Sequence, residues 1–277
     1  MGFDAIMLTG VPRSGTTLSC HLLNRLPNTV ALAEPMNVGK FARLRSRAAI
    51  LDMIEQFVAE QRATLLSRRV AVSRQVGGGV KDNFFTSERG PDGLRHSQGK
   101  PANVSFDKPL NSDFQIVIKH PAAFTALLPE LAARFPCYAI IRNPLSLLAS
   151  WDSVKIPVND GRAPAAERLA SDLKQALKTL KHRYDRQLCL MNWYFEQYRQ
   201  HLTPECILRY EDIIESGGAV LAAIVPSAGS LHEQLENRNR SDAYDWTGIS
   251  SIAERLLDSE GAYWDFYSRD EVRGLLK

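Results

Sequence analysis

Gly10-Val11-Pro12-Arg13-Ser14-Gly15-Thr16-Thr17 is the stretch of this chain that decides its fold. An apolar run from Ala5 to Leu8 precedes it, and leucines at helical spacing follow it from Leu18 to Leu26. A strand, a glycine-containing loop and a helix in this order form a site where backbone N–H groups hold an anion. We therefore predict a phosphate-binding loop, whose contact residues are Pro12, Arg13, Ser14, Gly15, Thr16 and Thr17.

The loop lacks a lysine that nucleotide triphosphatases need. Their loop reads G-x-x-x-x-G-K-[ST], with the lysine on the β- and γ-phosphates and the hydroxyl residue on Mg²⁺. Thr16 stands at the lysine position here, and Arg13, three positions earlier, is the one cation of the loop. The sequence therefore predicts phosphate binding without a magnesium-loaded triphosphate and without a metal.

Length and composition predict an ordinary globular protein. The 277 residues, 44% hydrophobic and 23% charged, suit a single α/β domain spanning residues 1–277. A net charge of only +3 does not suggest a nucleic-acid partner. No apolar run approaches the roughly 18 residues of a membrane span. The N-terminus, with Asp4, does not read as a signal peptide. Four cysteines without a CxxC pair favour reduced thiols, so the expected location is the cytoplasm.

Strand-like and helix-like segments alternate along the chain. Expected strands are 5–9, 29–33, 114–119, 137–141 and 206–210, and expected helices include 40–69, 122–134, 144–151 and long segments within 164–200. Such alternation predicts a P-loop-like α/β fold, with a central parallel sheet flanked by helices on both faces. Residues 73–112, rich in glycine and proline, have little periodicity, so an irregular insert or lid is expected there.

A second anion-binding segment follows the strand at 137–141. Arg142 comes directly after this strand, where ligands bind in α/β sheets, and Ser150 lies eight residues further on. One or two helical turns bring Ser150 toward the same point as Arg142. An arginine and a hydroxyl converging in this way suit a phosphate monoester.

These two segments together resemble the sulfotransferases that use PAPS (3′-phosphoadenosine 5′-phosphosulfate). The run from Pro12 to Leu18 is similar to their 5′-phosphosulfate loop, and Arg142-Asn143-Pro144 with Ser150 is similar to their R-[ND]-P-x-x-x-x-x-S motif for the 3′-phosphate. The resemblance implies that PAPS is the donor and that Arg142 and Ser150 hold its 3′ end. A sulfuryl group in transfer carries less charge than a phosphoryl group, so amides and cations suffice without a metal.

Two residues compete for the role of catalytic base. Glu34, flanked by Ala31-Leu32-Ala33, is expected to have a raised pKa from partial desolvation. Its placement is similar to the glutamate base of tyrosylprotein, carbohydrate and related bacterial sulfotransferases. His120 follows Lys119 directly, whereas cytosolic members carry K-x-H, and histidine suits base work near neutral pH. We favour Glu34 on placement and leave His120 open.

The resemblance assigns further roles beyond the base. Lys119 is similar to the lysine that stabilises the bridging oxygen of the leaving nucleotide, and Arg13 is expected to share this charge. Arg209-Tyr210-Glu211-Asp212 resembles a family segment, which implies a contact of Tyr210 with the adenosine. The basic residues Arg238 and Arg240 precede Asp245-Trp246 without the glycines of the corresponding cytosolic loop, so they receive no role.

The sequence therefore predicts a PAPS-dependent sulfotransferase acting on a hydroxyl or, less readily, an amine. Two alternatives stay open: a small-molecule kinase using MgATP, and a non-catalytic nucleotide-binding module. The missing lysine argues against the first, and the retention of Glu34 and Lys119 argues against the second. The acceptor, whether small molecule, carbohydrate or lipid, and the oligomeric state, with a homo-oligomer allowed, are not readable from these motifs.

Overall fold

Five parallel strands form the centre of the molecule. The structure is a computed structural model that describes residues 5–246 and 248–277, so the N-terminal segment with Asp4 lies outside the described residues. The strands, in spatial order, are β2 (Thr29–Ala33), β5 (Gln115–Lys119), β1 (Ile6–Gly10), β6 (Cys137–Ile141) and β7 (Ile207–Arg209). Every neighbouring pair is parallel. The α/β class predicted from the alternating pattern is confirmed.

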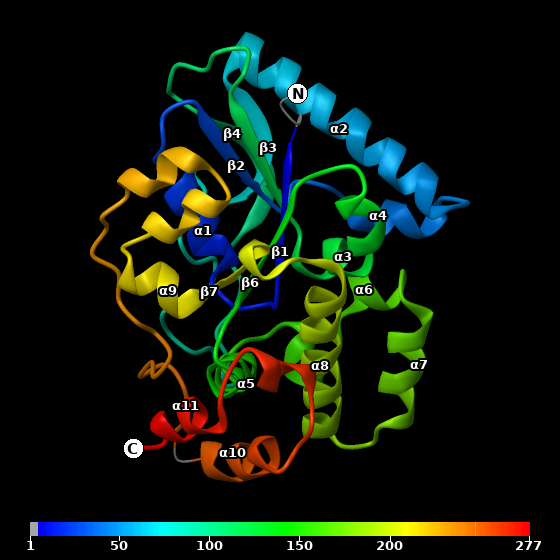
Figure 1. Ribbon diagram of the computed structural model, residues 1–277, viewed down its shortest axis with the longest axis vertical. Coiled ribbons are helices and arrows are strands. Elements are labelled where there is room, and N and C mark those ends of the chain that lie inside the picture. Colours follow the sequence, from blue (N-terminus) through cyan, green and yellow to red (C-terminus); the bar gives the residue numbers. More distant parts are fainter. Residues whose placement is uncertain (1–4, 247) are drawn as a thin grey trace.

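Helices connect the strands and cover both faces of the sheet (Figure 1). The α-helices are α1 (Thr16–Leu23), α2 (Arg47–Arg68), α3 (Pro121–Ala126), α4 (Leu128–Ala132), α5 (Pro144–Asp152), α6 (Pro164–Glu167), α7 (Ser171–Thr179), α8 (Arg183–His201), α9 (Tyr210–Glu215), α10 (Ile249–Leu257) and α11 (Arg269–Gly274). The 3₁₀ helices are η1 (Val38–Arg43), η2 (Pro157–Asp160), η3 (Pro204–Cys206), η4 (Ala219–Ala223), η5 (Pro226–Ser230) and η6 (Ala262–Asp265).

Alternate residues of the central strands feed two separate cores. In β1, Met7 packs with side chains of α2, α3, α5 and α8, whereas Ile6 and Leu8 pack with α1 and α9 on the other face. Successive side chains of a strand point to opposite faces, so a strand buried on both sides must be apolar throughout. In Figure 1, α1 and α9 lie on one side of the sheet, and α2, α4 and α8 lie on the other.

Two predicted helices are interrupted. The expected helix over 40–69 divides into η1 and α2, because the Ser46 side chain accepts a hydrogen bond from the Ala49 N–H at 3.2 Å and starts a new helix there. The expected helix over 122–134 divides into α3 and α4, with Pro129 in the first turn of the second helix, where proline is tolerated.

The segment 73–112 is more regular than the sequence predicted. β3 (Val70–Gln75) and β4 (Lys100–Ser105) pair as an antiparallel hairpin, so the expectation of an irregular insert is wrong for residues 73–75 and 100–105. The Ser73 hydroxyl accepts a hydrogen bond from the Ala33 N–H at 2.9 Å and ties this hairpin to β2. The hairpin thus covers an edge strand that would otherwise present unpaired backbone groups. Residues 76–99 form the long loop between its strands.

Three chain-wide features complete the fold. Cys20, Cys137, Cys189 and Cys206 are free thiols. Within residues 5–246 and 248–277, no helix is both long and apolar enough to span a membrane, and no three His, Cys, Asp or Glu side chains are grouped to hold a metal ion.

Candidate functional site

A cavity of about 1,490 Å³ opens at the carboxyl end of the parallel sheet. The residues that follow β1, β2, β5 and β6 meet there, and they bring Arg13, Glu34, Lys119 and Arg142 to one cavity. The carboxyl edge of a parallel sheet is where α/β proteins bind ligands. The volume exceeds the roughly 300–1,000 Å³ of an ordinary single-ligand pocket. The cavity therefore has room for two substrates at once.

Two glycines give the loop between β1 and α1 its shape. At Gly10, with φ 153°, a Cβ atom would lie 2.5 Å from the Ile140 carbonyl oxygen. At Gly15, with φ 99°, a Cβ atom would lie 2.7 Å from the ring of Tyr210. Neither position has room for a side chain, and the backbone conformation at Gly15 is one that only glycine adopts readily.

The N-terminus of α1 presents free N–H groups. Its N-cap is Gly15, which offers no side-chain acceptor. Within the described part of the chain, the N–H groups of Gly15, Thr16 and Thr17 donate to no acceptor, while these three residues line the cavity. Unpaired N–H groups and the helix dipole at this end attract an anion. The start of α1 therefore offers three N–H donors at the cavity, and phosphate binding by them stays a prediction.

Ser14 differs from its neighbours in the loop. Its hydroxyl donates to the Ile140 carbonyl at 2.6 Å, and its N–H donates to the Val11 carbonyl at 2.9 Å. Ser14 is fully buried and does not line the cavity. The expected contact of Ser14 with a ligand therefore does not fit this geometry. Ser14 shapes the loop, whereas Pro12, which lines the cavity, receives a hydrogen bond from Trp151 on its carbonyl.

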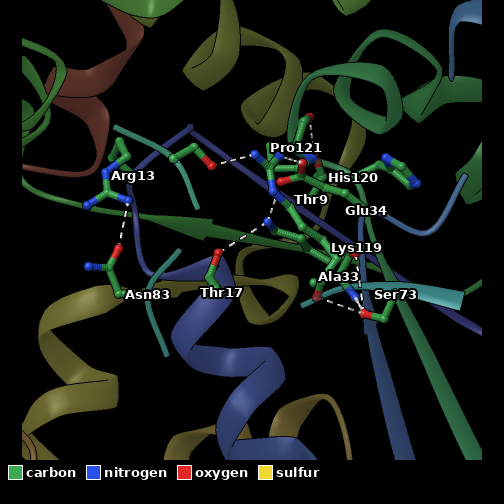
Figure 2. Close-up of polar contacts among 12 residues, drawn as sticks. Thr9, Arg13, Thr17, Ala33, Glu34, Ser73, Asn83, Lys119, His120 and Pro121 are labelled. Atoms are coloured by element: carbon green, nitrogen blue, oxygen red, sulfur yellow. Dashed lines mark hydrogen bonds and ion pairs between the residues drawn. The ribbon is translucent and has the colours of Figure 1, made fainter. Parts of the chain in front are cut away.

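Arg13 turns away from Lys119 and toward the hairpin loop. Its Nε donates to the Ser150 hydroxyl at 3.1 Å, and a terminal nitrogen donates to the Asn83 side chain at 3.3 Å. Its guanidinium lies 4.4 Å from the centre of the Phe85 ring. Figure 2 shows Arg13 and Asn83 on one side of Thr17, with Lys119 on the other.

Four guanidinium groups gather on this side of the cavity. Burial, together with repulsion from Arg95, Arg142 and Arg238, lowers the pKa of Arg13 to about 10, against an opposing effect of Tyr244. All four arginines line the cavity. Like charges held together cost free energy, and an anionic ligand offsets this cost. We call these four residues the arginine cluster.

Arg142 has a role in holding the protein together as well as a position in the cluster. It donates to the Asn239 side chain at 2.7 Å, to the Arg13 carbonyl at 3.1 Å and to the Arg238 carbonyl. It therefore joins the phosphate-binding loop to the segment around Arg238. The sequence analysis assigned no role to this segment. Its basic residues were the one sequence signal that could have placed it at the cavity.

Ser150 lies away from the cavity surface. Its side chain is fully buried, and its hydroxyl accepts from Arg13 rather than standing free beside Arg142. The Tyr244 side chain interacts with both Ser150 and Arg142, so these two residues lie close together, and their joint contact with one phosphate stays a prediction. In this structure the Ser150 hydroxyl orients Arg13.

Tyr210 packs its ring against the arginine cluster. Its ring lies 4.4 Å below the Arg142 guanidinium and against Gly15. Its hydroxyl accepts a hydrogen bond from the Arg238 N–H at 3.0 Å and donates to the Glu236 carbonyl at 3.3 Å. Tyr210 lines the cavity, where its ring can contact a ligand while its hydroxyl is already paired.

Glu34 and Lys119 meet on the other side of the loop (Figure 2). The Lys119 Nζ donates to Glu34 Oε1 at 2.7 Å and to the Thr17 hydroxyl at 3.3 Å. The other oxygen of Glu34 accepts from Arg74, on β3, at 2.7 Å. Lys119 is 2% exposed, and this carboxylate is its counter-ion. The pair stands directly beside the N–H groups at the start of α1.

The expected rise in the pKa of Glu34 is wrong. Burial favours a raised pKa, but the charges of Lys119 and Arg74 and the hydrogen bond from Lys119 outweigh it and lower the pKa to about 2. Glu34 is therefore ionised throughout the physiological range. The sequence showed the apolar neighbours of Glu34, whereas Arg74 comes from a hairpin 40 residues away that no motif marks.

His120 is buried, and its acceptor nitrogen already accepts a hydrogen bond from the protein. Its Nε2 accepts a hydrogen bond from the Met36 N–H at 3.1 Å. Burial lowers the pKa of His120 to about 4, despite the opposing charge of Glu34. A neutral imidazole with its one acceptor nitrogen engaged has no free lone pair for an acceptor proton. His120 therefore stabilises the backbone at Met36, two residues after Glu34.

Several cavity residues had no sequence signal. Their positions follow from the hairpin loop and the C-terminal segment, which fold over the cavity from outside the sheet. The residues are Arg74, Asn83, Phe85, Arg95 and Tyr244. Of these, Tyr244 is buried, and the charges of Arg142 and Arg13 lower its pKa although burial favours a raised value.

Two solved structures are similar to this chain. Sulfotransferase STF9 from Mycobacterium avium matches at 14% identity and a TM-score of 0.38, over 97% of this chain and 78% of that chain. Sulfotransferase STF1 from Mycobacterium tuberculosis H37Rv matches at 13% identity and a TM-score of 0.34, over 100% of this chain and 77% of that chain. No protein-family model and no curated protein matches the chain. At these identities and TM-scores, the similarity by itself assigns neither an activity nor a donor.

Proposed function

We propose that this chain is a sulfotransferase that moves the sulfuryl group of PAPS to an acceptor hydroxyl, or less readily to an amine. One observation carries the proposal. The free N–H groups of a lysine-free phosphate loop lie between the arginine cluster on one side and the Lys119–Glu34 pair on the other. This arrangement suits a donor with two anionic ends and a transferable group, and it offers no lysine at the Walker position for a triphosphate.

The two anionic ends of PAPS fit two different parts of the site. The N–H groups of Gly15, Thr16 and Thr17 would hold the 5′-phosphosulfate at the start of α1. Arg142 and its neighbours in the arginine cluster would hold the 3′-phosphate, because guanidinium groups pair well with phosphate oxygens. Tyr210, which is buried but lines the cavity, would contact the adenosine. No residue in this set calls for a metal ion.

Lys119 and Glu34 would carry the transfer itself. The acceptor oxygen bonds to sulfur as the bond from sulfur to the bridging oxygen breaks, and the electron pair leaves on the nucleotide. Lys119 would stabilise this developing charge, whereas Arg13 points to the other side of Thr17 and would act with the arginine cluster. Glu34 would take the acceptor proton. When Lys119 turns from Glu34 to the leaving oxygen, Glu34 loses one of its two cations and becomes a stronger base.

The location that we propose is the cytoplasm. The four free thiols are those expected in a reducing compartment. PAPS and its acceptor would then meet the enzyme there without a membrane barrier.

Calorimetry with the desulfated nucleotide PAP tests the donor. We expect micromolar or tighter binding in the presence of EDTA, unchanged by Mg²⁺. Tight binding of MgATP without binding of PAP would overturn the proposal and support a kinase. If PAP binds but no acceptor is ever sulfated from labelled PAPS, the chain is a nucleotide-binding module instead.

A matched pair of glycine variants locates the donor. Gly15→Ala adds a side chain at φ 99° against Tyr210, whereas Gly93→Ala adds one at φ 74° in open space. Both carry the backbone strain of a positive φ. We expect only Gly15→Ala to weaken PAP binding, by about tenfold or more, which equals the loss of one to two good hydrogen bonds.

A further inference from the structure

The cavity has a second wall that is unlike the arginine cluster. Apolar residues that are partly open to the cavity line this wall: Val38, Ala122, Ile156, Pro157, Pro164 and Ala165. We call these six residues the apolar wall. Partly exposed apolar side chains gathered on one side of a cavity mark a surface that a ligand covers.

The apolar wall begins where the reactive pair stands. Val38 starts η1 four residues after Glu34, and Ala122 lies in α3 three residues after Lys119. α3 packs against α6 and α8, and η2 packs against α8, so the wall continues from Glu34 into the space between these helices. Figure 1 shows α3, α6 and α8 as neighbours. A molecule lying on the wall would therefore present one end to Glu34.

A charged residue next to α6, Arg162, is already balanced. Arg162 lines the cavity beside Ala163, and its guanidinium donates to both oxygens of Glu167. Glu167, which is buried, also accepts from the Ala163 N–H at 2.8 Å. A second anion, or the hydroxyls of a sugar, would find no unpaired charge among these contacts. Burying polar groups without partners costs free energy, so the wall disfavours such acceptors.

Among the described side chains, one hydroxyl that lines the cavity lacks a partner, as do the buried Nε atoms of Arg74 and Arg95, which also line it. Tyr194, on α8, lines the cavity and is fully buried. Among the residues that the structure describes, its hydroxyl has no hydrogen-bond partner. A buried hydroxyl that stays unpaired is costly, and native structures pair nearly all such groups. Because Tyr194 lines the cavity, a bound ligand can supply the missing hydrogen-bond partner of its hydroxyl.

Resting on the proposed function, we propose that the acceptor is a compact apolar alcohol or phenol with a second polar atom at its far end. Its reacting hydroxyl lies at Glu34, its body lies on the apolar wall, and its distal oxygen or nitrogen pairs with the Tyr194 hydroxyl. The proton of the reacting hydroxyl goes to Glu34 as the oxygen–sulfur bond forms. Carbohydrate and acidic peptide acceptors are excluded by this assignment.

Three probes test the assignment through binding alone. Calorimetry compares 2,6-dihydroxynaphthalene, 2-naphthol and methyl β-glucopyranoside, each with the free protein and with the PAP-saturated protein. We expect both naphthols to bind and the glucoside not to bind. The second hydroxyl should tighten binding about fivefold, as one net hydrogen bond does.

Two tyrosine variants separate recognition from structure. Tyr194→Phe should remove the fivefold difference between the naphthols, because the apolar body still binds. Tyr138→Phe, at a half-buried tyrosine of β6 outside the cavity lining, should leave the difference unchanged. A third variant, Ile156→Asp, should weaken both naphthols and leave PAP binding intact. A fivefold difference that persists in Tyr194→Phe would overturn the role of Tyr194.

The outcomes also separate this inference from the proposed function. Binding of PAP without binding of either naphthol, or glucoside binding as tight as 2-naphthol, overturns the inference alone. Tyr194-dependent naphthol binding to a protein that does not bind PAP supports the apolar wall as a binding site and overturns the proposed donor.

Discussion

The two sides of the cavity are built from different kinds of sequence. The nucleotide side combines a glycine-dependent loop with arginines that come directly after strands or from nearby loops, so its chemistry rests on backbone amides and full charges. The apolar wall takes Val38 from η1, Ala122 from α3, Ile156 and Pro157 from the start of η2, and Pro164 and Ala165 from α6, so its residues come from three separate parts of the chain. A charged anion site needs particular residues at particular points. An apolar wall needs only shape, so many sequences make one and no motif marks it.

Lys119 and Glu34 lie between the two sides of the cavity. Their substitution should therefore lower turnover much more than it lowers PAP affinity. Lys119→Ala removes the cation beside the leaving oxygen, and we expect turnover to fall about 10³-fold. PAP affinity should fall far less, because the loop N–H groups and the arginine cluster remain. Single-turnover rates and calorimetry measure the two effects.

Lys108→Ala is the matched control for Lys119→Ala. Lys108 is also held by the protein, through the Asn24 and Leu26 carbonyls, and burial lowers its pKa to about 8. It should lose stability without losing turnover per folded molecule. If Lys119→Ala keeps more than a tenth of the wild-type rate, Lys119 is not the cation that stabilises the leaving oxygen.

Glu34→Gln should cost about 10²-fold in turnover with PAP binding nearly intact, since a general base contributes roughly 10²–10⁴-fold. His120→Ala should cost less than tenfold per folded molecule. Its main effect should be a lower melting temperature, because the Met36 N–H loses its acceptor. The reverse pattern, with a crippled His120 variant and an active Glu34 variant, would move the base to His120.

Arg142→Ala tests whether the nucleotide side reads the 3′-phosphate. Loss of a charge-assisted contact should weaken PAP binding about 10- to 100-fold. Adenosine 5′-phosphosulfate, which lacks that phosphate, should lose little. Arg142 also holds Asn239 and the Arg238 backbone, so equal losses for both nucleotides would show a structural role instead. Arg25→Ala, which breaks an exposed pair with Glu233, should change neither.

The sequence predicted the features that short local patterns encode, and it missed the contacts that distant segments make. The strand boundaries at 29–33 and 137–141 and the loop of residues 10–17 were accessible, because apolar runs and glycines encode them locally. Ser14 was placed correctly in the chain but not in its contacts, since a hydroxyl near a loop can bond to protein or ligand equally well. The contact of Ser150 with a phosphate stays a prediction. Arg74 could not be foreseen. It reaches Glu34 only because Ser73 fastens the β3–β4 hairpin to β2.

The smallest expected effect is on the pH profile, and it tests how firmly Arg74 and Lys119 hold Glu34. Glu34 has its pKa lowered to about 2 and His120 to about 4, so neither titrates between pH 5 and 8. With an alcohol acceptor, kcat/KM should therefore stay constant within about twofold over that range.

The sign of the effect on stability follows from the same pKa of Glu34. A carboxylate whose pKa is lowered on folding stabilises the protein above its unfolded pKa of about 4.3, and this stabilisation is lost as the pH falls toward 2. Arg74→Met removes one of the two cations and should shift both the acid limb of activity and this loss of stability to higher pH. Arg74→Lys should largely restore them. An acid limb near pH 6.5 in the wild type would instead identify a histidine of ordinary pKa as the base, because Glu34, with a pKa of about 2 in the free enzyme, does not titrate at that pH.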